Sequence, residues 1–211
     1  MITTLNLHGE IDVNSYIISN FGSDYIFIVD PGANFAYISS VIKKNNYKPY
    51  GILLTDGHFD HIGAVNKLVE KYNVPVLCST NAQTYLTNPE YNLSEYCTEK
   101  IIINSFQAID EDILTLPGDI PLSLRAFHTP GHTTDSMIYY CEQEGWAVTG
   151  DTVFKDSIGA THYPGGNFRV LINSIKTVIL NLPENTILYT GHGEPTTPSE
   201  VRNYLSTVWI S

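Results

Sequence analysis

Four segments of this chain share one pattern, in which a short apolar run is followed at once by a turn rich in Gly, Thr, His and Asp. The segments are 54–61, 127–133, 148–152 and 188–193. Short apolar runs bounded by such turns are typical of buried strands. Loops held at strand ends by a rigid sheet are where binding groups collect. The pattern therefore favours an α/β fold in which several strand ends present polar side chains.

The periodicity of the remaining segments predicts the other elements. Strands are expected at 16–19, 25–30, 50–55, 75–79, 101–106, 113–116, 122–128, 136–140, 146–149 and 187–190, and helices at 35–46, 62–72, 170–180 and 198–205. The stretch 87–99 has little pattern and is expected to be a loop or a short irregular helix. Strands followed by mixed strand and helix, twice over, favour two sheets packed face to face with helices outside. Because no Pro/Gly/Ser linker divides the chain, one domain is expected over residues 1–211.

Composition restricts the partners and the location. The chain has a hydrophobic fraction of 43% and a formal net charge of −11. An acidic chain repels phosphate backbones and anionic lipid, so nucleic acid and membrane are poor partner expectations. The cysteines at 78, 97 and 141 are widely spaced and odd in number, which argues against a disulfide framework and a thiolate metal site. Without a signal-like N-terminus or a membrane-length apolar run, a cytoplasmic protein is expected.

The turns of the four segments carry side chains that suit transition metals. The candidate ligands are His58, Asp60, His61, His132, Asp151 and His192. His nitrogen and carboxylate oxygen suit zinc, iron and manganese. A metal needs groups that converge from different strands, which four strand-end turns would supply. We expect His8 to be structural or exposed, and His128 to be a strand-end residue near the site rather than a ligand.

The same turns resemble those of a known family. They read His58-Phe59-Asp60-His61, His128-Thr129-Pro130-Gly131-His132-Thr133, Thr149-Gly150-Asp151-Thr152 and Thr190-Gly191-His192-Gly193. In that order the chain resembles the metallo-β-lactamase fold superfamily, in its glyoxalase II-like branch of hydrolases. The resemblance extends to 13–16, 29–33, 88–94 and 163–166. It implies an αββα sandwich of two mixed sheets with metals at one edge.

The resemblance also implies a role for each ligand. His58 and His132 would hold a first metal, and Asp60, His61 and His192 a second. Asp151 would bridge the two ions, which we expect to be Zn²⁺, with iron or manganese as alternatives. Asp30 and Thr55 would orient the ligands. Asp60 and Asp151 are the expected catalytic residues, and a water or hydroxide between the metals would be the nucleophile.

The chain departs from the family pattern at Asp56, where the usual His-x-His-x-Asp-His motif begins with His. Asp56 could bind the first metal directly, bind it through a water, or leave the first site weak. We hypothesise direct ligation, because Thr55, Gly57 and His58 around it are all retained. A third carboxylate would shift the preference toward harder ions such as manganese or iron(II).

A second departure lies in the segment 159–162. Relatives often carry a basic residue where this chain has Ala160, and His162 replaces their usual Asp or Tyr. We hypothesise that His162 contacts the substrate, acts as an acid or base, or supplies an extra metal ligand. The missing basic residue, together with the chain's end at Ser211 before any added helical domain, weakens the case for glutathione thioesters.

Three functions remain open at this point. The first is hydrolysis of a small-molecule ester or thioester. The second is binding of a metal or ligand with weak or no catalysis, which the altered first site would explain. A persulfide dioxygenase ranks lower, because it would use the His that Asp56 replaces. A β-lactamase also ranks lower, because those relatives usually carry Cys at the position of Asp151.

Overall fold

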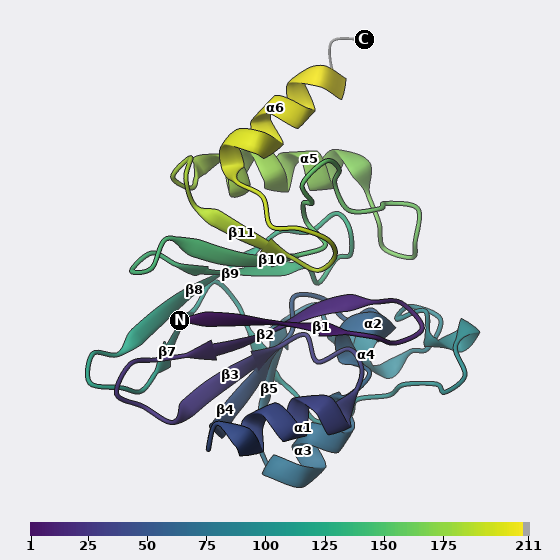
Figure 1. The fold of residues 1–211 in the computed structure, drawn as a ribbon. Coiled ribbons are helices and arrows are strands. Elements are labelled where there is room, and N and C mark those ends of the chain that lie inside the picture. The colour runs from purple at the N-terminus through teal and green to yellow at the C-terminus, as the bar shows by residue number, and fades with distance from the viewer. Residues whose placement is uncertain (209–211) are drawn as a thin grey trace.

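Strand β2 (Val13–Ser19) is buried along its whole length, because its two faces contact different apolar cores. Tyr16 and Ile18 belong to one core, and Val13 and Ile17 to the other. Successive side chains leave opposite faces of a strand, so consecutive apolar residues fit a sheet that is covered on both sides. In the computed structural model, which describes residues 1–208, this sheet is one of two central layers (Figure 1).

The first sheet has six strands in the order β1-β2-β3-β4-β5-β6. Their bounds are β1 (Ile2–Leu7), β2, β3 (Tyr25–Val29), β4 (Lys48–Leu53), β5 (Val76–Ser79) and β6 (Gln107–Ile109). The pairs β1–β2 and β2–β3 are antiparallel, and the pairs from β3 to β6 are parallel. Helices α1 (Phe35–Lys44) and α3 (Val65–Tyr72) cover its outer face, as Figure 1 shows.

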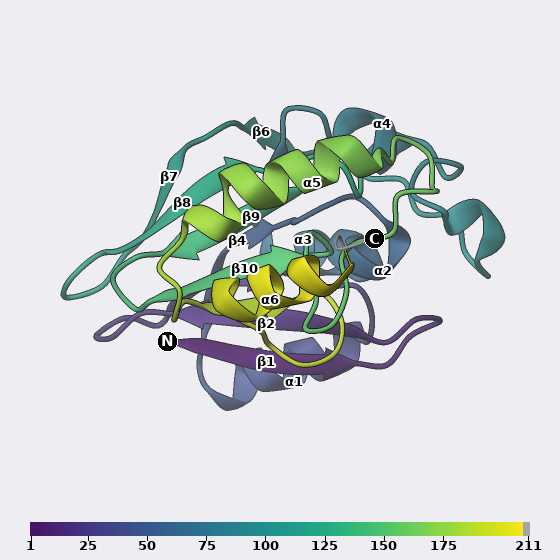
Figure 2. The same cartoon turned by 90° about the horizontal axis from the view of Figure 1, so that it is seen from above.

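The second sheet has five strands in the order β11-β10-β9-β8-β7. Their bounds are β7 (Ile113–Leu116), β8 (Leu122–His128), β9 (Met137–Cys141), β10 (Trp146–Gly150) and β11 (Ile187–Thr190). Only β10 and β11 pair in parallel. Helices α5 (Phe168–Thr177) and α6 (Pro198–Val208), with the short η2 (Ile179–Asn181), cover its outer face (Figure 2). Two mixed sheets flanked by helices confirm the predicted fold class.

No helix within residues 1–208 is long and apolar enough to cross a bilayer. The domain predicted over residues 1–211 includes 209–211, which lie outside the described residues.

The prediction of a strand at 101–106 is wrong. This segment has no regular structure, and β6 begins only at Gln107. Its backbone bonds to a loop residue and to a helix instead of a strand. Asn92 Nδ2 donates to Ile101 O at 2.9 Å, and Ile103 N donates at 2.7 Å to Leu86 O in helix α4 (Gln83–Thr87). The apolar side chains of the segment still pack on the first core, so burial produced a strand-like pattern without a strand.

The helix expected at 62–72 is interrupted. The structure has a single turn, α2 (Phe59–Ile62), and then α3. Gly63 separates them, and a Cβ there would lie 2.0 Å from Gly32 O. Ala64 N also donates to Pro31 O at 2.8 Å, so the backbone approaches the turn after β3 too closely for any side chain. The short η1 (Ser94–Tyr96) within a loop confirms the irregular character expected for 87–99, whereas α4 (Gln83–Thr87), which precedes this stretch, was not predicted.

The strand ends that carry the polar turns lie at one edge of the sandwich. Strand β8 runs antiparallel to β9, and β9 antiparallel to β10, so β8, β10 and β11 all end on the same side. Met137 N donates to Thr55 O at 2.7 Å, and Tyr139 Oη donates to Leu54 O at 2.7 Å. These bonds join β9 to the end of β4, and they bring the turns of both sheets together.

Candidate metal centre

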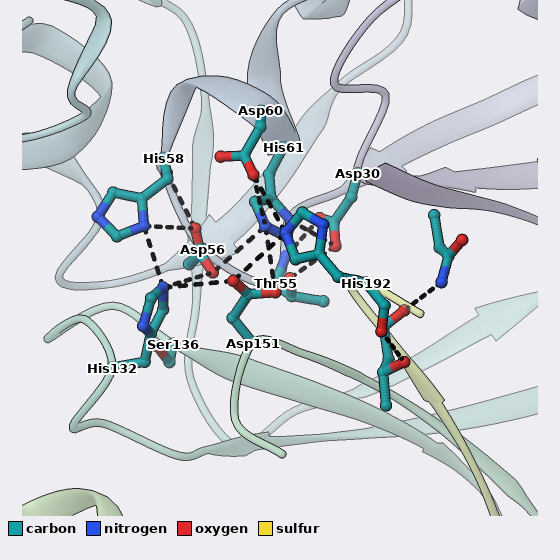
Figure 3. Close-up of polar contacts among 12 residues, drawn as sticks. Asp30, Thr55, Asp56, His58, Asp60, His61, His132, Ser136, Asp151 and His192 are labelled. Carbon is teal, nitrogen blue, oxygen red and sulfur yellow. Dashed lines mark hydrogen bonds and ion pairs between the residues drawn. The ribbon is translucent and has the colours of Figure 1, made fainter. Parts of the chain in front are cut away.

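The polar turns meet in one buried cluster, which Figure 3 shows in close-up. The turn after β4 comes from the first sheet, and the turns after β8, β10 and β11 come from the second. Among residues 1–208, two groups of three side chains could each hold a metal ion, with the ligand atoms of a group within 4.8 Å of one another. The groups are Asp56, His58 and His132, and Asp60, His61 and His192.

The first group is closed around two facing imidazoles. His58 Nδ1 lies 3.1 Å from His132 Nε2, and Asp56 Oδ1 lies 3.8 Å from His58 Nδ1. Asp56 Oδ2 lies 4.0 Å from His132 Nε2 and is buried without a hydrogen bond in the described chain. The same oxygen lies 3.9 Å from His61 Nε2 of the second group. Asp56 therefore points its free oxygen into the cluster, between the two groups, which favours direct ligation over a carboxylate turned away.

The second group is less enclosed. Asp60 Oδ2 lies 3.2 Å from His192 Nε2 and 3.9 Å from His61 Nε2. Asp60 and His61 are buried, whereas the His192 side chain is 28% exposed. This group therefore has a side that a small molecule can reach.

Asp151 lies between the two groups. Its Oδ1 is 3.5 Å from His61 Nε2, and its Oδ2 is 3.6 Å from His132 Nε2 and 3.5 Å from His192 Nε2 (Figure 3). One carboxylate thus faces a histidine of the first group and two of the second. This is the position that a bridging ligand needs.

The electrostatics of the cluster call for positive charge at its centre. Burial alone would lower the pKa of His61, but the carboxylates of Asp56 and Asp30 help to raise that pKa well above its usual range. Burial would raise the pKa of Asp151, yet the imidazoles of His192 and His61, each 3.5 Å from its carboxylate, hold that pKa well below its usual range. The surroundings of Asp151 therefore favour its charged form, and the described side chains that face this carboxylate are histidines.

The residues present fit bound metal. Asp56 Oδ2, His61 Nε2 and Asp151 Oδ1 are buried and make no hydrogen bond within residues 1–208. Buried polar atoms are nearly always paired, so three such atoms facing one another need a partner. Imidazole nitrogen and carboxylate oxygen are the donors that zinc, iron and manganese take. We take the cluster as a candidate site for two ions.

Two histidines are oriented by backbone carbonyls. His132 Nδ1 lies 2.7 Å from Ala160 O, and His192 Nδ1 lies 2.7 Å from Asp12 O. A proton held on Nδ1 leaves the Nε2 lone pair free. Both rings therefore present Nε2 to the cluster.

His61 makes an ion-pair contact with Asp30 on the side of its ring away from the cluster. His61 Nδ1 lies 3.1 Å from Asp30 Oδ2, and Asp30 accepts from Thr55 N at 2.8 Å and from Thr55 Oγ1 at 2.6 Å. All three residues are buried. Their arrangement matches the supporting role expected for Asp30 and Thr55.

Asn14 holds the turn that carries His192, a role that the sequence did not reveal. Its Nδ2 donates to Thr190 O at 3.1 Å and to Gly193 O at 2.9 Å, and its backbone N donates to Gly191 O at 2.8 Å. Asn14 thereby fastens the turn after β11 to the first sheet. Since Asn occurs widely in turns and at strand ends, the residue type alone did not indicate this role.

Replacing Asn14 by Ala is expected to lower the unfolding free energy by about 2 kcal/mol, because buried carbonyls lose their donor. The affinity of the second group for metal is expected to fall by about tenfold or more, as it does when ligand-orienting residues are removed. Denaturant unfolding and metal titration measure the two effects. The exposed Asn6, which donates to Asn14 Oδ1 at 2.7 Å, gives the control variant Asn6→Ala. Unchanged metal affinity in Asn14→Ala would contradict this role.

The cluster forms the floor of a cavity of about 460 Å³. Five of the candidate ligands line it: His58, Asp60, His132, Asp151 and His192. Asp56 and His61 lie behind them, almost fully buried. Apolar side chains such as Phe59 and Phe154 form part of the wall. The cavity suits a small substrate that reaches the cluster from one side.

His162 lies outside both ligand groups. Its side chain is exposed, and its ring centroid is 4.1 Å from that of Tyr163. Tyr163 lines the cavity and packs edge-on against His58, with the centroids 5.9 Å apart. Tyr163 and Ala160 are thus the residues of this turn that line the cavity, whereas a contact between His162 and substrate stays a prediction.

His8 and His128 also lie outside both ligand groups. His8 follows the end of β1, is exposed, and lies 3.1 Å from Asp12. His128 ends β8, with its Nε2 3.0 Å from Asp110 Oδ1.

Asp135 is a buried acid behind the first group that sequence reasoning missed. Its Oδ1 makes no hydrogen bond within the described residues, and its Oδ2 would lie 3.1 Å from a Cβ at Gly57. Burial, followed by the charge of Asp56, raises the pKa of Asp135 well above its usual range. A buried carboxyl group whose neutral form is favoured therefore packs against the loop that carries Asp56.

Comparison with known proteins identifies the family. The model of the family described as the metallo-beta-lactamase superfamily matches residues 8–192, a span that contains every candidate ligand. The chain belongs to the metallo-beta-lactamase superfamily. The expected family is thereby confirmed.

Curated relatives within the superfamily carry hydrolase names. The chain is 36% identical over 193 residues to "Probable metallo-hydrolase YqgX" of Bacillus subtilis, covering 89% of this chain and 88% of that protein. It is 31% identical over 175 residues to "Hydroxyacylglutathione hydrolase GloC" of Haemophilus influenzae, covering 81% of each.

Solved structures of the superfamily share the fold closely. The BLEG-1 B3 metallo-beta-lactamase superposes with a TM-score of 0.87 at 34% identity, covering 96% of this chain and 97% of that one. TTHA1623, solved in a di-iron-bound form, has a TM-score of 0.83 at 25% identity and covers 96% and 98%.

Proposed function

We propose that this protein hydrolyses a small ester or thioester with the help of two bound metal ions. The observation that carries the proposal is the position of Asp151, between two ligand groups on the floor of a cavity. A site that only stored a metal would need neither the paired groups nor the opening. Asp60 and Asp151 line the cavity and reach both the ligands and the substrate space.

Bound divalent ions would supply two effects here, a lowered pKa of water and polarisation of the substrate carbonyl. The chain's own groups then set the geometry. Asp151 and Asp60 accept hydrogen bonds from the attacking water and fix its direction. The water oxygen adds to the carbonyl carbon, the bond to sulfur or oxygen breaks, and the leaving group departs as a thiol or alcohol after taking up a proton.

Zinc is the ion that we propose first for both groups, with iron and manganese as alternatives. Asp56 gives the cluster three carboxylates, and oxygen donors favour harder ions. The di-iron form of TTHA1623 supports iron as an alternative for this chain.

The thioester class is supported by the name of the GloC relative. A second candidate is hydrolysis of β-lactams, which the similarity to the BLEG-1 enzyme favours. The two reactions need the same attack on a carbonyl carbon, and they differ only in the bond that breaks.

The test starts from protein freed of metal by a chelator. The apoprotein is reloaded with Zn²⁺, Fe²⁺ or Mn²⁺, and hydrolysis of small thioesters, aryl esters and a chromogenic cephalosporin is followed. The proposal expects thioester or ester turnover that returns only with metal. Stoichiometric binding of metal without turnover of any substrate would support the binding-only alternative. Oxygen consumption with a persulfide would support the dioxygenase.

We also propose a cytoplasmic location and a small-molecule substrate without nucleic-acid or membrane partners. The net charge of −11 supports the absence of nucleic-acid and membrane partners, because it disfavours contact with anionic polymers and lipid.

A further inference from the structure

A second cavity of about 510 Å³ lies beside the cavity that the candidate ligands line. The two cavities share the side chains of Ile11, Phe59, Leu93 and Tyr163. These four residues therefore stand between the metal cluster and the second cavity. A substrate whose reacting carbonyl reaches the cluster would place its remote part here.

The wall of the second cavity is held in place by Asn92. This buried residue donates through Nδ2 to Tyr85 O and Ile101 O, both at 2.9 Å, and its Oδ1 accepts from Ser94 N at 2.9 Å. Its backbone O accepts from Phe59 N at 2.8 Å, next to the ligands Asp60 and His61. The wall is thus fixed directly to helix α2, which carries the candidate ligands Asp60 and His61.

Leu93 is fixed in a conformation that leucine rarely adopts. Its φ is 66°, in the left-handed region. Asn92 and Ser94 hold it there from both sides, and its side chain lines both cavities. Sparsely populated backbone conformations collect at binding sites, where the surroundings maintain them.

The rim of the second cavity is apolar and exposed. Tyr96 is 83% exposed, Ile11 48% and Tyr163 39%. Contiguous exposed apolar side chains mark binding surfaces more often than isolated ones do. The rim therefore suits a ring or branched chain.

The charges at the second cavity are all negative. Glu10 and Glu90 line it, and among residues 1–208 no Lys or Arg lines either cavity. Lys100, in the same loop region, lies 2.6 Å from Glu95 and is paired there. A hydrogen bond from the backbone N of Thr98 lowers the pKa of Glu10, so this carboxylate is ionised at neutral pH.

We propose that the second cavity binds the remote part of the substrate, and that this part is an apolar group that is neutral or positively charged. The inference rests on the proposed hydrolase function. It disfavours thioesters of anionic thiols, glutathione included, since Glu10 and Glu90 would repel their carboxylates. The preference is set at the remote end, away from the carbonyl that the metals polarise.

The test compares thioesters that share one acyl group and differ only at the remote end. The leaving thiols are thiocholine, its neutral isostere 3,3-dimethylbutanethiol, and the anionic 3-mercaptopropionate. We expect kcat/KM to fall from the cationic to the neutral to the anionic ester, with about tenfold or more between the extremes. Each exposed carboxylate can contribute up to about fivefold. Added salt should compress the ratio.

Variants locate the effect at the second cavity. The double variant Glu10→Gln with Glu90→Gln keeps the acceptor for Thr98 and removes both charges. It should lower the ratio of cationic to anionic ester toward that of their uncatalysed hydrolysis, in which thiocholine is already the better leaving group. The matched control, Glu111→Gln with Glu184→Gln, removes two exposed charges that line neither cavity and should leave the ratio unchanged. A ratio that favours the anionic ester, or one that the first double variant does not change, would overturn the proposal.

Binding separates this inference from the hydrolase function. Thioethers with methylene in place of the carbonyl cannot be hydrolysed, and calorimetry gives their affinities. The same order of affinities without turnover of any ester would refute the hydrolase and keep the charge preference. Turnover with equal affinities for the three thioethers, and equal kcat/KM for the three esters, would keep the hydrolase and refute the preference.

Discussion

Asp151→Asn is expected to lower kcat for ester or thioester hydrolysis by about a thousandfold or more. The carboxylate faces His61, His132 and His192 and lies between the two ligand groups. Its charge joins the groups and balances the cations between them. Loss of several kcal/mol of stabilisation, at about 1.4 kcal/mol per tenfold in rate, gives this effect. Steady-state kinetics on metal-loaded protein measure it.

The matched control is Asp156→Asn, which makes the same change at an exposed position five residues further along the chain. It should leave kcat within about twofold of the wild type, as surface substitutions usually change little. Metal content distinguishes the ways in which Asp151→Asn could act. A variant that keeps two ions and full activity would show that Asp151 neither bridges nor orients water.

Removal of metal is expected to lower the unfolding free energy by about 4 kcal/mol when free metal had stood a thousandfold above its Kd. Without cations, Asp56, Asp60 and Asp151 face one another in a buried cluster where charge is poorly solvated. For a chain of this size, that loss corresponds to a Tm lower by about 8–16 °C. Thermal unfolding followed by circular dichroism, with chelator and after metal is restored, measures the shift.

Chelator already saturated with zinc is the control, because it adds the same salt without removing metal. It should leave Tm unchanged. Protein whose bound metal has been removed, as shown by elemental analysis, and whose Tm is unaltered would contradict a structural role for the ions.

The parts of the fold that follow short-range patterns could be predicted from sequence. The strands that end in polar turns, the helices near α1, α5 and α6, and the two-sheet class all follow from periodicity and turn residues. The segment 101–106 was misread, because buried apolar side chains look alike in a strand and in an extended loop. The break at Gly63 depends on a backbone contact with Gly32, which no local pattern shows.

The candidate ligands could be picked out because each sits in a turn with its own sequence pattern. Among the supporting residues, only Asp30 and Thr55 were expected, through the family resemblance. The roles of the others could not be predicted, since they depend on distant partners. Asn14 bonds to a turn more than 170 residues away in the sequence. Tyr163 rather than His162 lines the cavity, a choice set by the path of a loop. Asp135 shows its significance only through its burial behind Asp56.

Metal content per chain tests the central claim most directly. The protein is purified without chelator or added metal, and elemental analysis gives the equivalents of zinc, iron and manganese. Two groups joined by Asp151, with Asp56 as a ligand, predict close to two equivalents in total. A value of one, rising to two in Asp56→His, would mean that Asp56 does not support the first ion. Metal-free protein that takes up none of the three ions on titration would contradict the account.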